Sequence, residues 1–298
     1  MKKRWLVNLL LLLTVAGLVT FLYVRPQGKA QGAKAYEIST LKLSDFSALS
    51  IEFSSKAPVG FVKTNGFWRM TQPYKARADQ QAVLRILSIV AATSNEKFSG
   101  TEAGALEKFG LNNPVVRIKM LSKDATEVFA FGTYNPVTEE QYVAYKNSIY
   151  LLPSSYSEAG TIQPIELVDK KPLKPTEKVV GFDFSHLEQW QAVGLNLDVV
   201  NGQWKTNVAT ANPTQNELNE WLDFSWMQAQ ATSVEIYTPD RKTPYVSFAV
   251  KMKDGTKVHF DRIQESPEYI LGRPDEGLQY HFTNDVGFTM LNPPLNLK

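Results

Sequence analysis

Cysteine is absent from the 298-residue chain. Its absence excludes disulfide bonds, thiolate metal ligands, a cysteine nucleophile and a lipidated N-terminal cysteine. It does not identify the cellular compartment, because exported proteins also fold without disulfides. The fold must therefore be held together by its core alone, and hydrophobic residues, at 43% of the sequence, are numerous enough to form one.

A strong charge of either sign is also missing from most of the chain. The formal net charge is +2, from 32 basic and 30 acidic residues, but four of the basic residues flank one apolar segment near the N-terminus. The remaining 28 basic and 30 acidic residues give a net charge of −2. A near-neutral body lacks the basic footprint of a nucleic-acid-binding protein, so no nucleic acid partner is expected.

Recognisable catalytic patterns are missing as well. The sequence has no Gly-x-Ser-x-Gly elbow and no phosphate-binding Walker loop. Ser185 and His186 are adjacent, but neighbouring residues of a strand point to opposite faces, which argues against a catalytic dyad. The other histidines are His259 and His281, and none of the three has a second histidine at metal-ligand spacing. We interpret all three as surface or strand-edge residues and expect no metal.

Two pairs of adjacent carboxylates, Glu139-Glu140 and Asp275-Glu276, fall in stretches typical of turns. Acid–base catalysis by such a pair needs one carboxyl group to be desolvated, so that its pKa rises. Side chains at a charged loop tip are solvated, and we expect both pairs to be ordinary surface residues. The sequence thus predicts a protein that is not an enzyme and has no cofactor.

The longest apolar run covers residues 5–24, WLVNLLLLLTVAGLVTFLYV, and contains no charge. As a helix rising about 1.5 Å per residue it would span about 30 Å, the thickness of the hydrocarbon core of a bilayer. Basic residues before it place the N-terminus in the cytoplasm, and aromatic rings at its two ends suit the headgroup level. The residues that predict this anchor are Lys2, Lys3, Arg4, Trp5, Tyr23 and Arg25.

A cleaved signal peptide is the alternative interpretation of this run, because Ala33-Lys34-Ala35 fits a small-x-small cleavage site. That site lies well beyond the run, which is also longer than the usual signal core of about 7–15 residues. We therefore predict an uncleaved single-pass anchor in residues 1–25 and a flexible tether in residues 26–35. Under either interpretation the rest of the chain lies outside the cytoplasm.

The same order of signals occurs twice, in residues 36–166 and 179–298, with a charged, proline-containing linker at 167–178. Each copy has an Asn-Gly pair, the strongest short hairpin signal, because both positions of a type I′ turn need positive φ. The hairpin strands are predicted at 59–64 and 67–71 in the first copy, and at 190–200 and 203–206 in the second. The shared order of signals indicates an internal duplication, although the offset drifts because loops differ in length.

Trp68 and Trp204 each follow an Asn-Gly turn at the same spacing. We interpret them as repeat-core residues that pack the helix of each copy on its sheet. A carbohydrate-stacking platform is the alternative, and solvent exposure of either ring would favour it.

Each hairpin is followed by a helix start and then by alternating apolar and polar segments. Asp79 can cap a helix over 80–93, and Asn212-Pro213 can open a helix that ends near residue 224. An extra segment in the first copy, 101–109, predicts a short helix. The fold class predicted is α+β: an N-terminal transmembrane helix, then two similar units, each an antiparallel sheet with one helix across it. The later strands are predicted at 115–121, 127–132, 141–146 and 148–152, and at 245–251, 257–261, 269–272 and 278–283.

Four tyrosines, Tyr134, Tyr142, Tyr145 and Tyr150, gather in the strands of the first copy. Cross-strand packing within the sheet is the simpler interpretation. Because Tyr142 and Tyr145 fall on opposite faces of one strand, a partner-binding surface is the alternative.

Three short motifs resemble those of a known family. The run WRMTQP at 68–73 is followed by Ala78-Asp79, FGLNNP occupies 109–114, and Phe131-Gly132 precedes Tyr142-Val143. These motifs are similar to those of the bacterial domain-of-unknown-function 4340 family, with Phe and Asn in place of a Tyr and an Asp. The second copy keeps Trp204 but lacks the Gly-Leu-Asp-x-Pro element.

The resemblance implies a bacterial inner-membrane protein with one N-terminal anchor, a cytoplasmic N-terminus and a periplasmic body. Some family members are associated with loci of gliding-motility-type ABC transporters, which implies an envelope or transporter protein as partner. We therefore expect a non-catalytic scaffold or accessory subunit. An envelope glycan-binding or glycan-modifying domain, with a site between the two units, and a simple spacer are the alternatives. The oligomeric state stays open.

Overall fold

The computed structural model describes residues 14–15, 35–101, 104–123, 125–239 and 244–297. Within these ranges no helix is both long and apolar enough to cross a bilayer. Nearly all of the predicted anchor and tether lies outside them, so the membrane span stays a prediction. The anchor residues that lie outside the described ranges are Lys2, Lys3, Arg4, Trp5, Tyr23 and Arg25.

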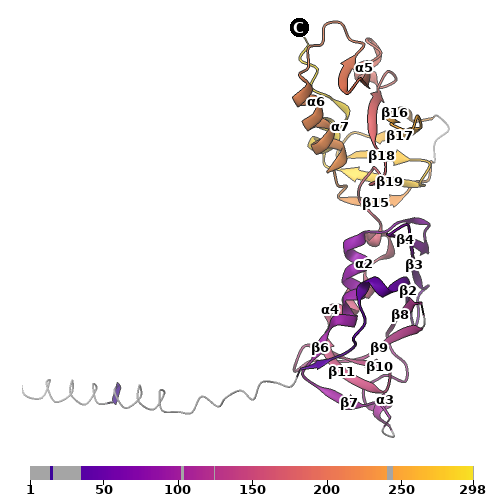
Figure 1. Ribbon diagram of the computed structural model, residues 1–298, viewed down its shortest axis with the longest axis vertical. Helices are drawn as coiled ribbons and strands as arrows, with labels where there is room; N and C mark the ends of the chain where they lie inside the picture. The colour runs from indigo at the N-terminus through magenta and orange to yellow at the C-terminus, as the bar shows by residue number, and fades with distance from the viewer. Residues whose placement is uncertain (1–13, 16–34, 102–103, 124, 240–243, 298) are drawn as a thin grey trace, which may run out of the picture.

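The first sheet is antiparallel throughout and follows the predicted hairpin and meander. Its strands are β2 (Phe46–Phe53), β3 (Val59–Thr64), β4 (Phe67–Gln72), β5 (Ala76–Arg77), β7 (Lys97–Ser99), β8 (Val116–Ser122), β9 (Thr126–Asn135), β10 (Glu140–Tyr145) and β11 (Ser148–Pro153). In the described residues their order is β5-β4-β3-β2-β8-β9-β10-β11-β7 (Figure 1). Asn65 and Gly66 both have positive φ at the β3–β4 turn, as the type I′ interpretation requires.

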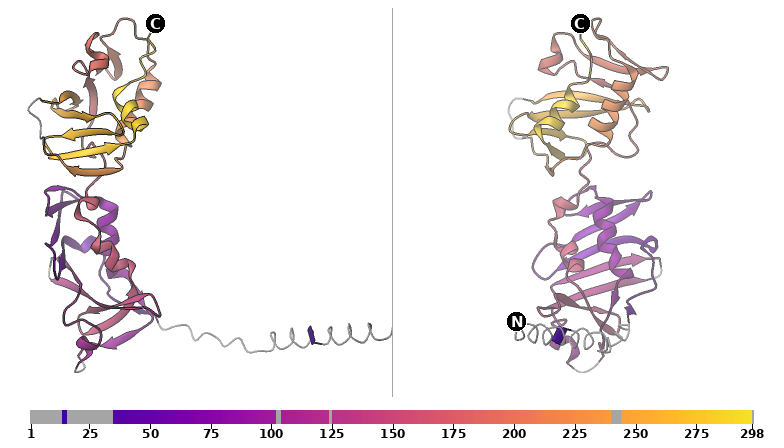
Figure 2. Two further views of the ribbon diagram at one scale, coloured as in Figure 1. Left: turned by 180° about the vertical axis from the view of Figure 1, so that it is seen from behind. Right: turned by 90° about the vertical axis from the view of Figure 1, so that its left-hand side faces the viewer.

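The second sheet is also antiparallel, and it lies end to end with the first along the long axis of the molecule (Figure 2). Its strands are β12 (Val179–Asp183), β13 (Asn196–Val200), β14 (Gln203–Thr206), β15 (Ser233–Ile236), β16 (Val246–Met252), β17 (Lys257–Gln264), β18 (Tyr269–Arg273) and β19 (Leu278–Phe282). Over the described part of the chain their order is β14-β13-β12-β16-β17-β18-β19-β15. A separate short ladder pairs β1 (Tyr36–Glu37) with β6 (Thr93–Ser94).

The two sheets have the same strand order. Eight strands of the first, β4-β3-β2-β8-β9-β10-β11-β7, correspond one by one to the eight strands of the second. Even the edge strands agree, because β7 and β15 each precede the meander in sequence and pair with its last strand. This agreement supports the interpretation of an internal duplication.

Helices cover one side of each sheet. In the first unit, α2 (Gln80–Leu87) continues into η2 (Ser88–Ala91) and packs beside α4 (Ser155–Thr161). In the second, α6 (Gln215–Leu222) continues into the π-helical segment η4 (Asp223–Met227), which contacts α7 (Asn284–Leu291). The prediction of one helix per unit is therefore wrong: α4 and α7 were missed. Short helical turns elsewhere are η1 (Leu43–Asp45), α3 (Ala105–Lys108), η3 (Pro164–Leu167) and α5 (Glu188–Gln191).

Other boundaries also differ from the sequence prediction. The strands β2 and β12 were missed, although each is central and joins its hairpin to its meander. The strand predicted at 190–200 begins only at Asn196, because α5 and a turn precede it. The second helix is capped by Thr214, not Asn212: Thr214 and Glu217 form a capping box.

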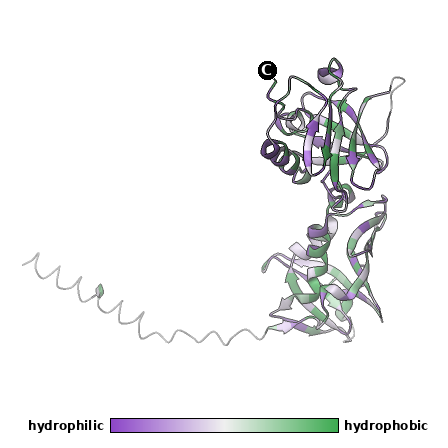
Figure 3. Ribbon diagram, turned by 45° about the horizontal axis from the view of Figure 1, so that its top comes forward, coloured by the Kyte–Doolittle hydropathy of each residue, from purple (hydrophilic) through white to green (hydrophobic). Residues whose placement is uncertain are grey.

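Hydrophobic and hydrophilic residues alternate along the strands, which places the core between each sheet and its helices (Figure 3). The second core is dominated by aromatic rings around Trp226. Its ring centroid lies 5.2 Å from that of Phe182, 5.9 Å from Phe248 and 5.7 Å from Phe260. Such tilted and edge-on contacts suit the ring quadrupoles, so this cluster anchors η4 on the sheet.

Side-chain N–H groups cap the C-terminal end of α7 by donating hydrogen bonds to its last carbonyl groups. The last four carbonyls of a helix have no intrahelical partner. Here the indole N–H of Trp221 donates to Thr289 O (2.7 Å), that of Trp226 to Met290 O (3.0 Å) and that of Trp190 to Leu291 O (2.8 Å). The fourth carbonyl, that of Phe288, accepts from the amide of Asn292 (2.8 Å). Three tryptophans thus fix α7 to the second unit.

Candidate functional site

The two units meet at a buried arginine, Arg77, on the edge strand β5 of the first sheet. Its guanidinium donates from Nε to Glu276 Oε1 (3.0 Å) and from Nη2 to Glu276 Oε2 (3.1 Å). Glu276 follows β18 in the second unit, and its side chain is only 9% exposed. The remaining donors of Arg77 reach the Asp169 carboxylate, the Lys171 and Leu173 carbonyl oxygens and the Tyr280 hydroxyl.

A second buried arginine, Arg273 at the end of β18, ties the linker to the second unit. Its Nη1 donates to Pro172 O (2.6 Å) and to Glu177 Oε2 (3.0 Å), while Nε donates to Asp275 Oδ1 (3.0 Å). The charged, proline-containing linker therefore accepts hydrogen bonds from Arg77 of the first unit and from Arg273 of the second. No buried side-chain nitrogen or oxygen in the described residues lacks a hydrogen-bond partner.

Burial and charge together shift the pKa values of two carboxyl groups at the junction of the units, Glu276 and Asp169, in opposite directions. Burial alone would raise the pKa of Glu276, but the positive charges of Arg77 and Arg273 outweigh it and hold that pKa below its ordinary value. Burial raises the pKa of Asp169, and the charge of Arg77 offsets this rise only in part. Opposed pKa values can mark an acid–base pair. Here, however, both carboxylates bind one guanidinium, which favours a structural role.

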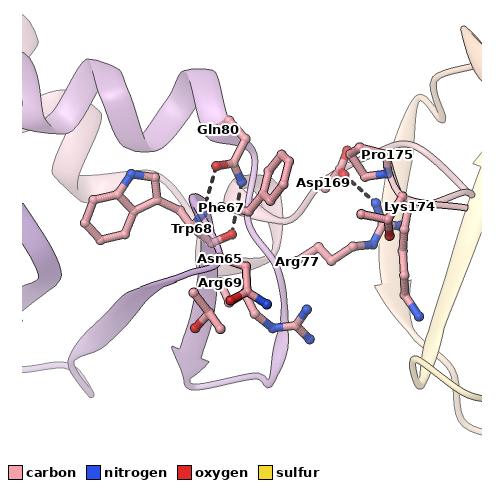
Figure 4. Close-up of a pocket in the computed structure, with 11 residues that line it drawn as sticks. Asn65, Phe67, Trp68, Arg69, Arg77, Gln80, Asp169, Lys174 and Pro175 are labelled. Atoms are coloured by element: carbon pink, nitrogen blue, oxygen red, sulfur yellow. Dashed lines mark hydrogen bonds and ion pairs between the residues drawn. The ribbon is translucent and has the colours of Figure 1, made fainter. Parts of the chain in front are cut away.

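A pocket of about 280 Å³ opens beside this network, between the β3–β4 hairpin and the linker (Figure 4). The hairpin contributes Asn65, Phe67 and Arg69, while the linker contributes Lys174 and Pro175. Figure 4 shows Arg77 between the two walls. The other residues that line the pocket are Thr64, Trp68, Gln80, Asp169 and Thr176. No histidine lines it, and its one carboxylate, Asp169, already contacts Arg77.

Trp68 and Trp204 are both buried, and their backbones are held in the same way. Trp68 N donates to Gln80 Oε1 (2.8 Å) and Gln80 Nε2 donates to Trp68 O (3.0 Å; Figure 4). Trp204 and Gln215 repeat this pair at 2.6 and 2.9 Å. Each glutamine is the first residue of its helix. These residues join helix to hairpin, and neither indole ring offers an exposed platform for a sugar.

The four tyrosines do not share one exposed surface. Tyr145 is buried, stacks on Phe129 with centroids 4.4 Å apart and donates to Glu127 Oε2 (2.7 Å). Tyr150 is buried too, and Tyr142 packs on Phe109 at 4.3 Å. Tyr134 alone of the four is exposed, at 51%. The partner surface proposed from all four is therefore wrong, and the alternative of packing within the sheet describes three of them.

Two surface assignments need correction as well. His281 is buried on β19, where Nδ1 lies 2.9 Å from Glu268 Oε1, although His186 and His259 are exposed. Glu276 was expected at a solvated loop tip and is instead the buried partner of Arg77. Glu139 is exposed, as expected for a turn. Within the described residues no group of three or more His, Asp or Glu side chains could hold a metal ion.

The motifs FGLNNP and Phe131-Gly132 contact each other on the outer face of the first sheet. Thr133 N donates to Phe109 O (2.9 Å), and Leu111 covers Gly132, where a Cβ atom would collide with the Phe109 carbonyl. Gly132 is therefore required for close approach of two backbones. These motif residues are architectural, since they pack the segment around α3 against β9 and β10.

Sequence reasoning missed the junction residues. Arg77 lies in the run KARAD, one residue before the Ala78-Asp79 motif, and Arg273 follows an apolar strand. An arginine within or at the end of an apolar segment is a weak signal for a buried ion pair. Nothing in the local sequence identifies the partners, which are up to 203 residues away.

Comparisons with known proteins give one family. Neither a curated protein nor a solved structure matches the chain. A family model described as a domain of unknown function, DUF4340, matches residues 68–246, more than half of the chain. The match begins at Trp68, crosses the junction and ends where β16 begins. The chain therefore belongs to the DUF4340 family of domains of unknown function.

Proposed function

We propose that this protein is a non-catalytic scaffold or accessory subunit of an envelope or transporter complex. Residues 1–25 would hold it in the bacterial inner membrane, with the two sheet units in the periplasm. The observation that carries the proposal is the buried ion network of Arg77, Asp169 and Glu276. It fixes two sheet units end to end, so that they form one elongated body suited to holding a partner at a set distance from the membrane.

The energetics of the junction support this role. A flexible linker alone would let two units move independently, which is the default for connected domains. Moving the units apart would break the hydrogen bonds that Arg77 donates across the junction to Glu276 and Tyr280. A spacer needs this stiffness as well, but it would tolerate substitutions anywhere on its surface, whereas a scaffold would not.

The glycan-binding alternative has one observation in its favour, which is the pocket between the β3–β4 hairpin and the linker. The lining argues against glycan modification, because glycoside hydrolysis uses two carboxyl groups flanking the scissile bond. Only Asp169 is present, and it contacts Arg77.

Two experiments on the full-length chain test the proposal. A reporter that is active only outside the cytoplasm, fused after Lys298, should be active. If it is inactive, and a reporter that works only in the cytoplasm is active at the same position, the envelope role must be abandoned. A photo-crosslinking residue introduced in living cells at exposed positions, Tyr134, Phe224 and Phe288 among them, should join the chain to one discrete envelope protein at some positions and not others. Crosslinks no stronger than background at every exposed position would reject the scaffold and leave the spacer.

A further inference from the structure

Arg69 is a cation without a partner at the edge of the junction pocket. Within the described part of the chain it has no ion pair and no side-chain hydrogen bond. It pairs in register with Val62 on one side and with Arg77 on the other. Like charges directly opposite each other on a sheet are destabilising. The donors of Arg77 are occupied by Glu276 and Asp169, so nothing offsets the charge of Arg69.

The second hairpin shows what an ordinary arrangement looks like. Lys205 follows Trp204 as Arg69 follows Trp68, and it is exposed in the same way. Its cross-strand neighbour, however, is Asp198, an opposite charge that itself pairs with Lys251. Positions where a local rule is broken without a compensating contact are expected at functional sites. The comparison shows that Arg69, unlike Lys205, lies opposite a cation.

The rest of the pocket supplies a second cation and apolar surface. Lys174 lies on the opposite wall, with carboxylate neighbours at 3.5–3.7 Å. Phe67, although aromatic, is 44% exposed, and Pro175 is exposed across from it. Of the three cations in the lining, Arg77 and Lys174 already have carboxylate partners, so in the described residues Arg69 is the cation left for an anion. The guanidinium of Arg69 is complementary to an anionic group of a ligand. The ring of Phe67 and Pro175 are complementary to an apolar group of the same ligand.

We propose that this pocket binds an organic anion: a carboxylate or phosphate carried by a small apolar or aromatic group. The anionic group pairs with the guanidinium of Arg69, which offers donors in a planar fork suited to such oxygens. The apolar group lies between Phe67 and Pro175. A volume of about 280 Å³ is small for a ligand site, so it holds one ring-sized group. This ligand site goes beyond the scaffold role and does not depend on it.

The test uses the full-length protein in a nonionic detergent and three probes: 3-phenylpropionate, the uncharged 3-phenylpropan-1-ol, and acetate. Ligand-observed NMR titration measures binding. We expect saturable binding of 3-phenylpropionate, and about tenfold weaker binding of the alcohol, because a charge-assisted hydrogen bond is lost. Acetate should bind more weakly than 3-phenylpropionate, since it lacks the ring. Equal affinity for 3-phenylpropionate and the alcohol, or no saturable binding of either, would overturn the proposal.

Matched variants assign the site. Arg69→Gln should weaken 3-phenylpropionate binding by about tenfold without loss of folding, because Arg69 has no partner to lose. Phe67→Ser should weaken the acid and the alcohol alike. Lys205→Gln changes the corresponding residue of the second hairpin and should leave binding unchanged. If Arg69→Gln and Lys205→Gln bind 3-phenylpropionate with equal affinity, the ligand does not bind at Arg69 and the proposed site is rejected.

A further arm distinguishes a free small anion from the end of a polypeptide. The probes are an N-acetylated tripeptide ending in a phenylalanine carboxylate and its C-terminal amide. Tighter binding of the acid than of 3-phenylpropionate supports the site and identifies a chain terminus as the ligand. Weaker binding supports the site and identifies a free small anion. Binding of acid and amide with equal affinity contradicts the role assigned to Arg69.

Discussion

Arg77 and Glu276 are 199 residues apart in sequence, yet they form a bidentate ion pair that joins the two sheet units. Their side chains are 7% and 9% exposed. Each charge has been taken out of water, and each is compensated chiefly by the other. The pair therefore determines how the two units are held together, and it is the first target for mutation.

Glu276→Gln should lower the free energy of unfolding by about 3–5 kcal/mol, because it removes one of the two carboxylates that compensate the buried guanidinium of Arg77. Urea denaturation followed by circular dichroism measures the change. The matched control is Glu52→Gln, which breaks the half-exposed pair with Lys119 and should cost less than about 1 kcal/mol. Equal losses in the two variants would show that the junction pair contributes no more than a surface pair.

The same carboxyl group predicts how stability depends on pH. Since the folded-state pKa of Glu276 is lowered from 4.5, its contribution is present above pH 4.5 and is lost as pH falls through the lower folded value. The raised pKa of Asp169 acts in the opposite direction: its contribution is present at low pH and is lost as pH rises through the folded value. As pH is lowered from about 5 to about 3, the urea midpoint of the wild type should decrease. The urea midpoint of Glu276→Gln should decrease less over the same range. A steeper fall in the variant would contradict the assignment.

Trp226→Phe should destabilise the second unit by about 2–4 kcal/mol, because it opens a cavity and leaves the carbonyl of Met290 without its donor. Phe224→Leu is the control on the same π-helical segment, and since Phe224 is 64% exposed it should change stability by less than about 0.5 kcal/mol. Thermal unfolding compares the two. A Trp226→Phe protein as stable as the wild type would refute the role of the indole donors at the end of α7.

Two glycines allow a further matched comparison. Gly132→Ala should cost at least about 2 kcal/mol, because the new methyl group collides with the carbonyl of Phe109. In α4, the corresponding atom at Gly160 would lie 3.6 Å from its nearest neighbours, Ile118 and Ile51. Gly160→Ala should therefore stabilise the helix, by about 0.5–1 kcal/mol. The two urea midpoints should move in opposite directions, and movement in the same direction would contradict the packing described.

Much of the fold follows from local sequence. The Asn-Gly turns fixed both hairpins, and alternation located the eight meander strands to within a few residues. The strand β2 was missed because its register shifts between Phe46 and Ala48, which breaks the alternation. The helices α4 and α7 were missed because neither has a periodic apolar face. Tryptophans from distant segments cap the C-terminal end of α7.

The junction could not be predicted in the same way. Arg77, Asp169 and Glu276 come from a short edge strand, the linker and a turn, and only the folded chain brings them together. The neighbours of Asp275-Glu276 in sequence are those of a turn, and they predict a solvated loop tip. Glu276 is buried against Arg77 of the first unit, a contact that the residues around Glu276 in sequence do not indicate.

The most direct test of a single rigid body is a distance distribution between spin labels on the two units. Because the native chain has no cysteine, Arg117→Cys on β8 and His259→Cys on β17, both at exposed positions, label each unit once. Pulsed electron paramagnetic resonance on the full-length protein should give one narrow distribution, which Glu276→Gln broadens. A broad or multiple distribution in the protein with Glu276 intact would show that the units move independently, and the rigid scaffold would have to be abandoned.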